Sequence, residues 1–153
     1  MLISLALAAA PVEPAFDPLR FFTGQTRGTA RLKVILRKAK PVTVRGTGKM
    51  RADGTLVLDQ MVTDGGGPPR ARRWLLRETT SGHYAGTLSD ARGPVIGEVS
   101  GTTLRLSFTS DGGFRIRQTL TLQPDGRTLA NRLEARRFGI RVAVLTERIV
   151  KVD

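Results

Sequence analysis

The residues best suited to acid–base chemistry lie in one segment, residues 83–97 (HYAGTLSDARGPVIG). It holds the only His and the only Tyr of the chain, His83 and Tyr84, and it also contains Asp90. An enzyme using Asp90 with His83 or Tyr84 would need these groups to converge in one pocket. A simpler interpretation is that His83 and Tyr84 begin a strand, and that Asp90 lies in a turn where its side chain bonds to nearby backbone. The segment therefore indicates two strands and a turn rather than a catalytic site.

Other motifs give no support to catalysis. RGTGKM (45–50) ends like a phosphate-binding loop, but no Gly stands five residues before Gly48, and Met50 replaces the Ser or Thr that such a loop needs. One His without clustered ligands does not predict a metal site. The chain has no Cys, which excludes disulfides, thiol nucleophiles and thiolate metal sites. We predict no catalytic residue, no metal and no cofactor.

Polar residues that interrupt apolar faces are more informative. Gln60 lies between Leu58 and Val62 on one face of an alternating run. A buried polar group without a partner costs roughly 1–3 kcal/mol, so each such residue requires a partner inside the protein. The pattern recurs at Gln118 between Ile116 and Leu120, at Asn131 between Leu129 and Leu133, at Arg72 beside Trp74 and Leu76, and at Thr146 and Arg148 in the series Ile140, Val142, Val144, Val150 and Val152.

Two arrangements would satisfy these groups. They could bond to one another and to water in a filled core, or they could line a cavity that holds a ligand with a polar head. Aromatic residues make up only 5% of the chain, which favours a partly solvated cavity. Arg72, Arg148 and Trp74 would suit an anionic head group. The candidate ligand-binding residues are Arg72, Trp74, Tyr84, Gln118, Asn131 and Arg148.

The elements that must position these residues are strands. From Phe21 onward apolar and polar residues alternate with period two, as in RLKVILRK (31–38), where Leu32, Val34 and Leu36 share a face. Turn residues recur every eight to fourteen positions and delimit about ten strands. Closing such a meander removes its exposed edges. We therefore predict an all-β fold, a closed antiparallel up-and-down barrel of about 8–10 strands.

Length and charge set wider limits. A chain of 153 residues forms one domain. Residues 1–15 begin with an apolar run and contain Ala6-Leu7-Ala8, typical of a signal-peptide-like leader. Residues 16–153 then form the barrel domain. The net charge of +12 suits anionic partners, but an Arg-rich solvated surface is the preferred explanation.

Four segments resemble domain-of-unknown-function family 3833: FDPLRFFTG (16–24), RRW (72–74), YAGTLSDARGPVIG (84–97) and NRLEARRFGIRV (131–142). The resemblance implies a lipocalin-like (calycin-like) barrel in a bacterial envelope protein, and no established activity. The chain departs from the family by lacking a lipid-bearing Cys and in Thr87-Leu88-Ser89. The residues that match the family by position are Phe21, Phe22, Gly24, Arg72, Trp74, Tyr84, Gly86, Asp90, Gly93, Gly97, Asn131, Phe138 and Gly139.

Together these features predict an exported protein of the periplasm or cell envelope that binds a small amphipathic or anionic hydrophobic molecule without transforming it. The alternative is an envelope structural or interaction protein with a filled core, which docks on an anionic membrane through its basic surface. Nucleic acid is not an expected partner of an exported protein.

Overall fold

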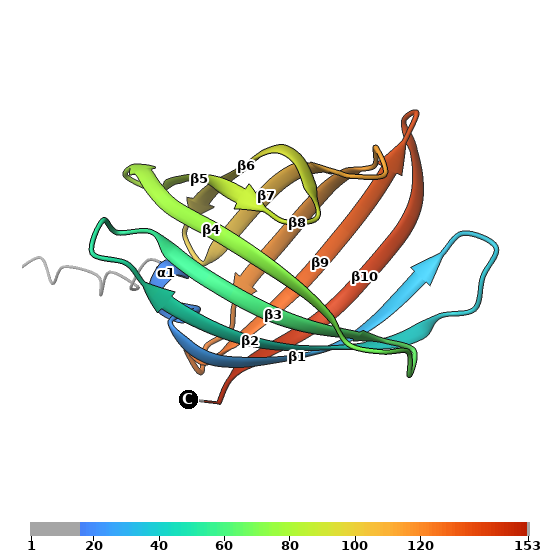
Figure 1. Cartoon of the computed structure of the whole chain (residues 1–153), viewed down its shortest axis with the longest axis horizontal. Coiled ribbons are helices and arrows are strands. Elements are labelled where there is room, and N and C mark those ends of the chain that lie inside the picture. Colours follow the sequence, from blue (N-terminus) through green and yellow to red (C-terminus); the bar gives the residue numbers. More distant parts are fainter. Residues whose placement is uncertain (1–15, 153) are drawn as a thin grey trace, which may run out of the picture.

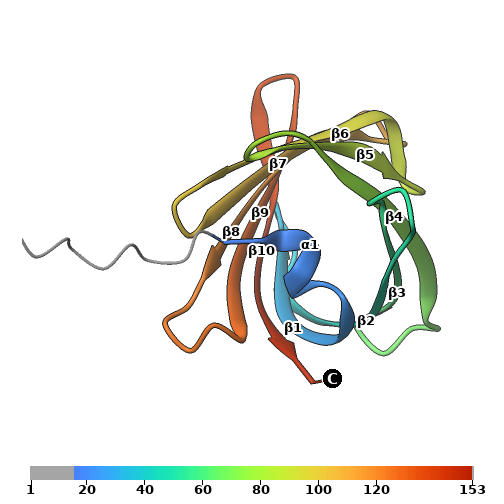
Figure 2. The same cartoon turned by 90° about the vertical axis from the view of Figure 1, so that its left-hand side faces the viewer.

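The computed structural model describes residues 16–152 as one closed antiparallel barrel, which a short helix precedes (Figures 1 and 2). The predicted leader, residues 1–15, lies outside the described residues. In the described part of the chain, no helix is long and apolar enough to span a membrane. The elements are α1 (Pro18–Phe21), β1 (Gly24–Val34), β2 (Lys40–Met50), β3 (Leu56–Asp64), β4 (Arg70–Thr80), β5 (His83–Leu88), β6 (Ala91–Ser100), β7 (Thr103–Ser110), β8 (Arg115–Leu122), β9 (Thr128–Arg137) and β10 (Ile140–Lys151).

Every strand pairs with its neighbours in sequence, and β1 pairs with β10 to close the sheet. The closing ladder is long, running from Thr26 opposite Lys151 to Val34 opposite Ala143. Closure gives every strand a neighbour on both sides, which reduces the tendency of an open meander to pair with other chains. The predicted all-β, up-and-down, closed barrel is confirmed.

The strands form where the sequence alternates. On β3, Leu56, Leu58, Gln60 and Val62 point inward and are buried, while Asp59 between them is exposed. The preceding turn uses the expected residues, because the Asp53 carboxylate accepts a hydrogen bond from the Thr55 amide over 2.9 Å. Alternation and turn chemistry thus agree on the strand and its start.

The helix α1 closes one end of the barrel (Figure 2). Asp17 caps it by accepting a hydrogen bond from the Arg20 amide over 3.1 Å, and Pro18 occupies its first turn. Phe21 and Phe22 pack into the core and stack edge-to-face. The Lys151 ammonium group donates to the Phe21 carbonyl over 2.6 Å, which fastens the helix to the end of β10. The sequence did not predict this helix, because four residues are too few to show a helical period.

Two predicted strand faces are wrong. Leu36 does not continue the inner face of β1, because β1 ends at Val34 and Leu36 is 97% exposed in the following turn. On β10, Thr146 and Arg148 point outward and are exposed, whereas the inner face carries Leu145, Glu147 and Ile149. A register irregularity between Arg141 and Ala143 accompanies the start of β10. Since the strand is apolar on both faces there, its hydrophobic pattern did not define the inner one.

Candidate ligand-binding cavity

The barrel interior contains two hydrophobic clusters with polar residues between them. The larger cluster lies toward α1 and includes Leu56, Leu58 and Leu76, while the smaller one contains Ala30, Val42, Val44 and Val62. A cavity of about 180 Å³ reaches from one cluster to the other. Its lining comprises Phe22, Leu32, Val42, Val44, Leu56, Leu58, Gln60, Val62, Asp64, Arg70, Arg72, Trp74, Leu76, Leu104, Leu106, Gln118, Leu120, Asn131, Leu133, Leu145, Glu147 and Ile149.

The two ends of the cavity differ. Phe22, which follows α1, lines the closed end. Asp64 and Arg70 line the other end, and both are exposed, so the cavity reaches solvent there. Each of these two charges has an outer partner: Asp64 is 2.9 Å from Lys40, and Arg70 is 2.8 Å from Asp90. The cavity is therefore a blind tube with a charged mouth.

On one wall, Gln60 holds two donors from β4. Its side-chain oxygen Oε1 accepts from Arg72 Nε over 2.7 Å and from Trp74 Nε1 over 2.8 Å. The Arg72 guanidinium also lies 5.8 Å from the centroid of the Trp74 ring, and that ring meets Phe108 edge-to-face. Gln60 is opposite Arg72 in the β3–β4 ladder, so strand register places these groups together. The wall is preorganised because each of its polar side chains is fixed by another.

On the other wall, Asn131 and Glu147 are opposite each other in the β9–β10 ladder. Asn131 Nδ2 donates to Glu147 Oε1 over 2.9 Å. The Glu147 carboxylate lies over Gly28 of β1, where an added Cβ would stand 2.1 Å from Oε2. A larger residue at position 28 would therefore displace the carboxylate from its position.

Charge in the cavity is balanced across the two walls. Burial raises the pKa of Glu147 above its ordinary value, although the Asn131 hydrogen bond and the Arg72 charge act in the opposite direction. Burial likewise lowers the pKa of Arg72, against the attraction of Glu147. Among the ion pairs of the described residues, none joins Arg72 directly to Glu147. The two charges face the same cavity without contact.

Two amide groups in this cavity have unused hydrogen-bonding capacity. Asn131 Oδ1 is buried and accepts no hydrogen bond from the described residues. Gln118 is buried and lines the cavity, and none of the hydrogen bonds among the described residues uses its side chain. A buried polar group is normally satisfied by protein, water or ligand. These two amides are therefore free to bond to water or to a ligand.

The structure brings together four of the six predicted residues. Arg72, Trp74, Gln118 and Asn131 line the cavity. Tyr84 is buried in the larger hydrophobic cluster but is not part of the lining. Arg148 is exposed on the outer face, so its predicted place inside the barrel is wrong.

Sequence reasoning missed Glu147 and did not include Gln60 among the candidate ligand-binding residues. A signal for Glu147 was present, since it interrupts the apolar pair Leu145 and Ile149 just as Gln60 interrupts Leu58 and Val62. Glu147 was overlooked because the opposite face of β10 begins with three apolar residues, Ile140, Val142 and Val144, which favours that face as the inner one.

The segment 83–97 does not form one site. His83 is exposed at the start of β5, and its ring nitrogen Nδ1 lies 3.1 Å from the Ser81 carbonyl. Tyr84 donates to Glu78 Oε2 over 2.8 Å, and burial raises its pKa. Asp90, beyond the far end of β5, pairs with Arg70 rather than with its own turn, which corrects the predicted local bond. Within residues 16–152, no three His, Cys, Asp or Glu side chains gather to hold a metal.

The closed antiparallel barrel with its plugged end and internal cavity is a lipocalin-like fold. The chain belongs to the family described as Protein of unknown function (DUF3833), which matches residues 7–151. The resemblance seen in the sequence is thus confirmed.

Solved structures with this fold share little sequence with the chain. The S-type phycobiliprotein lyase CPES from Guillardia theta is 7% identical, with a TM-score of 0.67, over 88% of this chain and 90% of that one. Rv2717c from M. tuberculosis is 15% identical, with a TM-score of 0.70, over 94% of this chain and 100% of that one. A protein of unknown function from the DUF3598 family of Nostoc punctiforme is 13% identical, with a TM-score of 0.62, over 95% of this chain and 53% of that one. No curated protein matches the sequence.

Proposed function

We propose that the protein binds a small amphipathic molecule inside its barrel and does not transform it. The observation that supports this most directly is the unsatisfied acceptor Asn131 Oδ1, which lines a largely apolar cavity to which Gln118 contributes a second amide without a hydrogen-bond partner. In a core filled only by protein, such unsatisfied polar groups would lower the stability of the fold. A bound polar head would satisfy both.

The head group must match the two walls. Arg72 offers donors to an acceptor such as a carboxylate or carbonyl, and Asn131 Oδ1 together with Glu147 offers acceptors to a hydroxyl or an amide N–H. Because Glu147 partly offsets the charge of Arg72, a head that carries both an acceptor and a donor fits better than a bare anion.

The apolar part of the ligand must suit the size of the cavity. An apolar cavity of roughly 150 Å³ can hold a benzene ring, so a space of about 180 Å³ holds a ring or a short chain. A longer molecule would extend past Asp64 and Arg70 into solvent. The S-type phycobiliprotein lyase CPES has the same fold, which is compatible with a small-molecule partner.

The direct test is displacement of a fluorescent probe, 8-anilinonaphthalene-1-sulfonate, from the purified protein. Decanoate, decanol and decylamine share one chain length and differ in the head, so their relative displacement reports head-group selection. Trp74 is the only Trp of the chain and lines the cavity, so its emission gives a second reading of occupancy. Native mass spectrometry of protein from its own host would reveal a retained ligand.

A matched pair of variants locates the site. Arg72→Gln alters the cavity wall, whereas Arg73→Gln alters the next residue, which points outward and pairs with Asp59 over 2.7 Å. We expect Arg72→Gln to weaken displacement by decanoate roughly tenfold, because hydrogen bonds to charged groups contribute about 1.5–3 kcal/mol, and Arg73→Gln to leave it unchanged. Absence of any retained molecule, together with no saturable change in Trp74 emission, would contradict the proposal.

We also propose a periplasmic or envelope location, supported by the leader-like pattern of residues 1–15. Fractionation of the native host, with the mass of the mature chain, tests this separately. An intact leader on a cytoplasmic protein would overturn it.

A further inference from the structure

The side chains of Leu36 and Phe138 are large and apolar, yet both lie almost fully in solvent, at residues with positive φ. Leu36 is 97% exposed and Phe138 is 91% exposed. Their φ angles are 63° and 50°, and they are the only non-glycine residues with positive φ in the described part of the chain. Bulky residues seldom adopt this region. At Phe138 the turn accounts for it, because Phe138 and Gly139 form a two-residue hairpin loop in which both residues have positive φ.

Both residues lie at hairpin tips at the open end of the barrel. Leu36 is in the β1–β2 turn and Phe138 is in the β9–β10 turn, and Figure 1 shows both hairpins at the end opposite α1. The amide of Ile35 donates to the carbonyl of Val142 over 2.9 Å, so the first tip adjoins the start of β10. Ile35 and Ile140 are themselves 52% and 60% exposed. The tips and the start of β10 thus place four exposed apolar side chains, one or two at a time, at the open end of the barrel.

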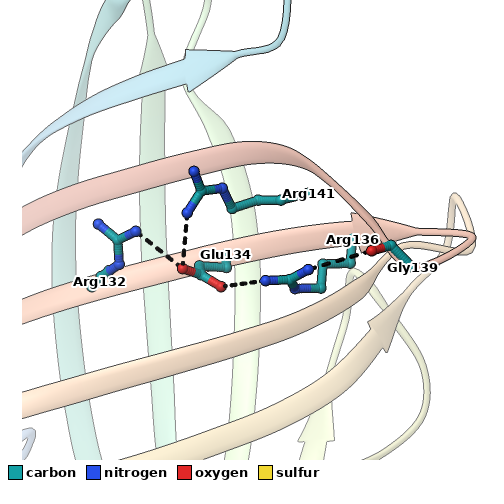
Figure 3. Close-up of polar contacts among 5 residues, drawn as sticks. All are labelled: Arg132, Glu134, Arg136, Gly139 and Arg141. Atoms are coloured by element: carbon teal, nitrogen blue, oxygen red, sulfur yellow. Dashed lines mark hydrogen bonds and ion pairs between the residues drawn. The ribbon is translucent and has the colours of Figure 1, made fainter.

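Cationic residues surround the second tip. Glu134 on β9 is 3.0 Å from Arg132, 3.5 Å from Arg136 and 3.6 Å from Arg141, and Arg136 also donates to the Gly139 carbonyl over 3.3 Å (Figure 3). The single carboxylate of Glu134 therefore pairs with three guanidinium groups, which leaves this cluster with a net positive charge. Two further arginines of β8, Arg115 and Arg117, line a surface groove with Glu134, Arg136 and Gly139.

The first tip is also basic, since Arg37 and Lys38 follow Leu36 directly. The Arg137 guanidinium is held between two rings, 5.3 Å from the Phe114 centroid and 5.4 Å from that of Phe138. Apolar groups at the tips with an excess of cations behind them form the arrangement that binds anionic lipid surfaces.

We propose that the rim formed by residues 35–38 and 136–141 docks the open end of the barrel on an anionic bilayer. Leu36 and Phe138 enter the acyl boundary, and the surrounding arginines bind lipid phosphates. A bilayer fits better than a folded partner, because single side chains on separate tips offer no continuous patch of the size that a stable protein interface needs. The charge of +12 supplies long-range attraction to the same surface. The inference does not depend on what the cavity holds.

The chain contains no Cys, which allows a site-specific test with the full protein. Leu36→Cys, Phe138→Cys and, as a control, Met50→Cys are labelled with the environment-sensitive dye NBD; Met50 is also exposed, at 44%, but it ends β2 close to Phe22 and α1, at the opposite end of the barrel. Vesicles of phosphatidylcholine with phosphatidylglycerol should raise emission at residues 36 and 138 and not at residue 50. Vesicles of phosphatidylcholine alone should give little change.

Sedimentation with the same vesicles measures how much the apolar tips and the arginines each contribute to vesicle affinity. We expect the double variant Leu36→Ser/Phe138→Ser to bind at least roughly tenfold more weakly. The variants Arg115→Gln and Arg117→Gln should each weaken binding roughly fivefold. Arg27→Gln and Arg45→Gln, exposed and paired across β1 and β2, remove the same charge elsewhere and should have smaller effects.

The outcomes are separable. Binding that weakens with salt and loses affinity in the tip variants supports the proposal. Equal loss from the β8 variants at Arg115 and Arg117 and from the control variants at Arg27 and Arg45 would show diffuse attraction without a docking site and would overturn the proposal. Normal binding of the tip variants would overturn it as well. Failure to sediment with anionic vesicles at low salt overturns it whatever the probe-displacement results, since those report on the cavity alone.

Discussion

The indole of Trp74 donates its Nε1 hydrogen to Gln60 Oε1 over 2.8 Å inside the barrel. The bond crosses from β4 to β3 and puts the polar edge of the only Trp against the same oxygen that Arg72 uses. An apolar core could bury a Phe at this position without any acceptor. The pairing therefore ties the stability of the barrel to the polar cavity wall.

Replacing Gln60 tests this coupling. Gln60→Leu leaves two buried donors without an acceptor, and we expect it to lower the free energy of unfolding by about 2–4 kcal/mol. Gln60→Glu retains the accepting oxygen and should cost less, because the new carboxylate also pairs with Arg72. Urea unfolding followed by Trp74 fluorescence and by circular dichroism measures both variants. Equal stability of the two variants would show that the hydrogen bonds of Gln60 Oε1 to Arg72 and Trp74 do not stabilise the barrel.

Glu147 gives the barrel a pH dependence of definite sign. Because its pKa is raised in the folded state, its contribution to stability is complete below the unfolded value of 4.5 and is lost as pH rises through the folded pKa. Glu147→Gln should therefore gain stability relative to the natural protein as pH increases from 4.5 to neutral. Chemical denaturation across this range is the measurement.

Glu134 provides a control of opposite sign on the same pair of strands. The Arg132 hydrogen bond and the neighbouring arginines lower its pKa, so its stabilisation exists above the unfolded pKa and is lost as pH falls through the folded one. Glu134→Gln should be the less stable protein at neutral pH, and the difference should vanish in acid. The same pH trend in both variants would contradict the two assignments.

Tyr84 lies in the core but outside the cavity lining, and a conservative variant can separate these roles. Tyr84→Phe removes the hydrogen bond to Glu78 and should cost about 0.5–1.5 kcal/mol. Binding of the fluorescent probe should not change. A marked loss of probe affinity in a variant that stays folded would show that Tyr84 contributes to ligand binding after all.

Close approach of backbone makes Gly86 intolerant of a side chain. An added Cβ would stand 1.7 Å from the Leu75 carbonyl oxygen on β4, and neither strand can yield without breaking the ladder. Gly86→Ala should lower the free energy of unfolding by at least about 2 kcal/mol, and Tm by about 4–8 °C. Gly67→Ala is the matched control, because its nearest neighbour would be 3.3 Å away in an exposed turn. Scanning calorimetry of the pair decides the matter.

Much of the cavity was predictable because its polar residues are conspicuous. Gln118 and Asn131 each stand alone between two apolar residues of one strand face, and both line the cavity. Tyr84 shows the limit of that reasoning. Its position on an inward face was evident, but the distance of that face from the cavity depends on how strands curve around the barrel.

The sequence by itself determined most of the strands and the all-β class, because alternation with period two and Asp-Gly turns are local properties of the chain. The tertiary structure decided which face of β10 points inward, since both faces are apolar at its start and only pairing with β1 and β9 distinguishes them. Pairing also placed Glu147 opposite Asn131 and over Gly28. Closure supplied these contacts because they join residues far apart in sequence, whose proximity no local pattern encodes.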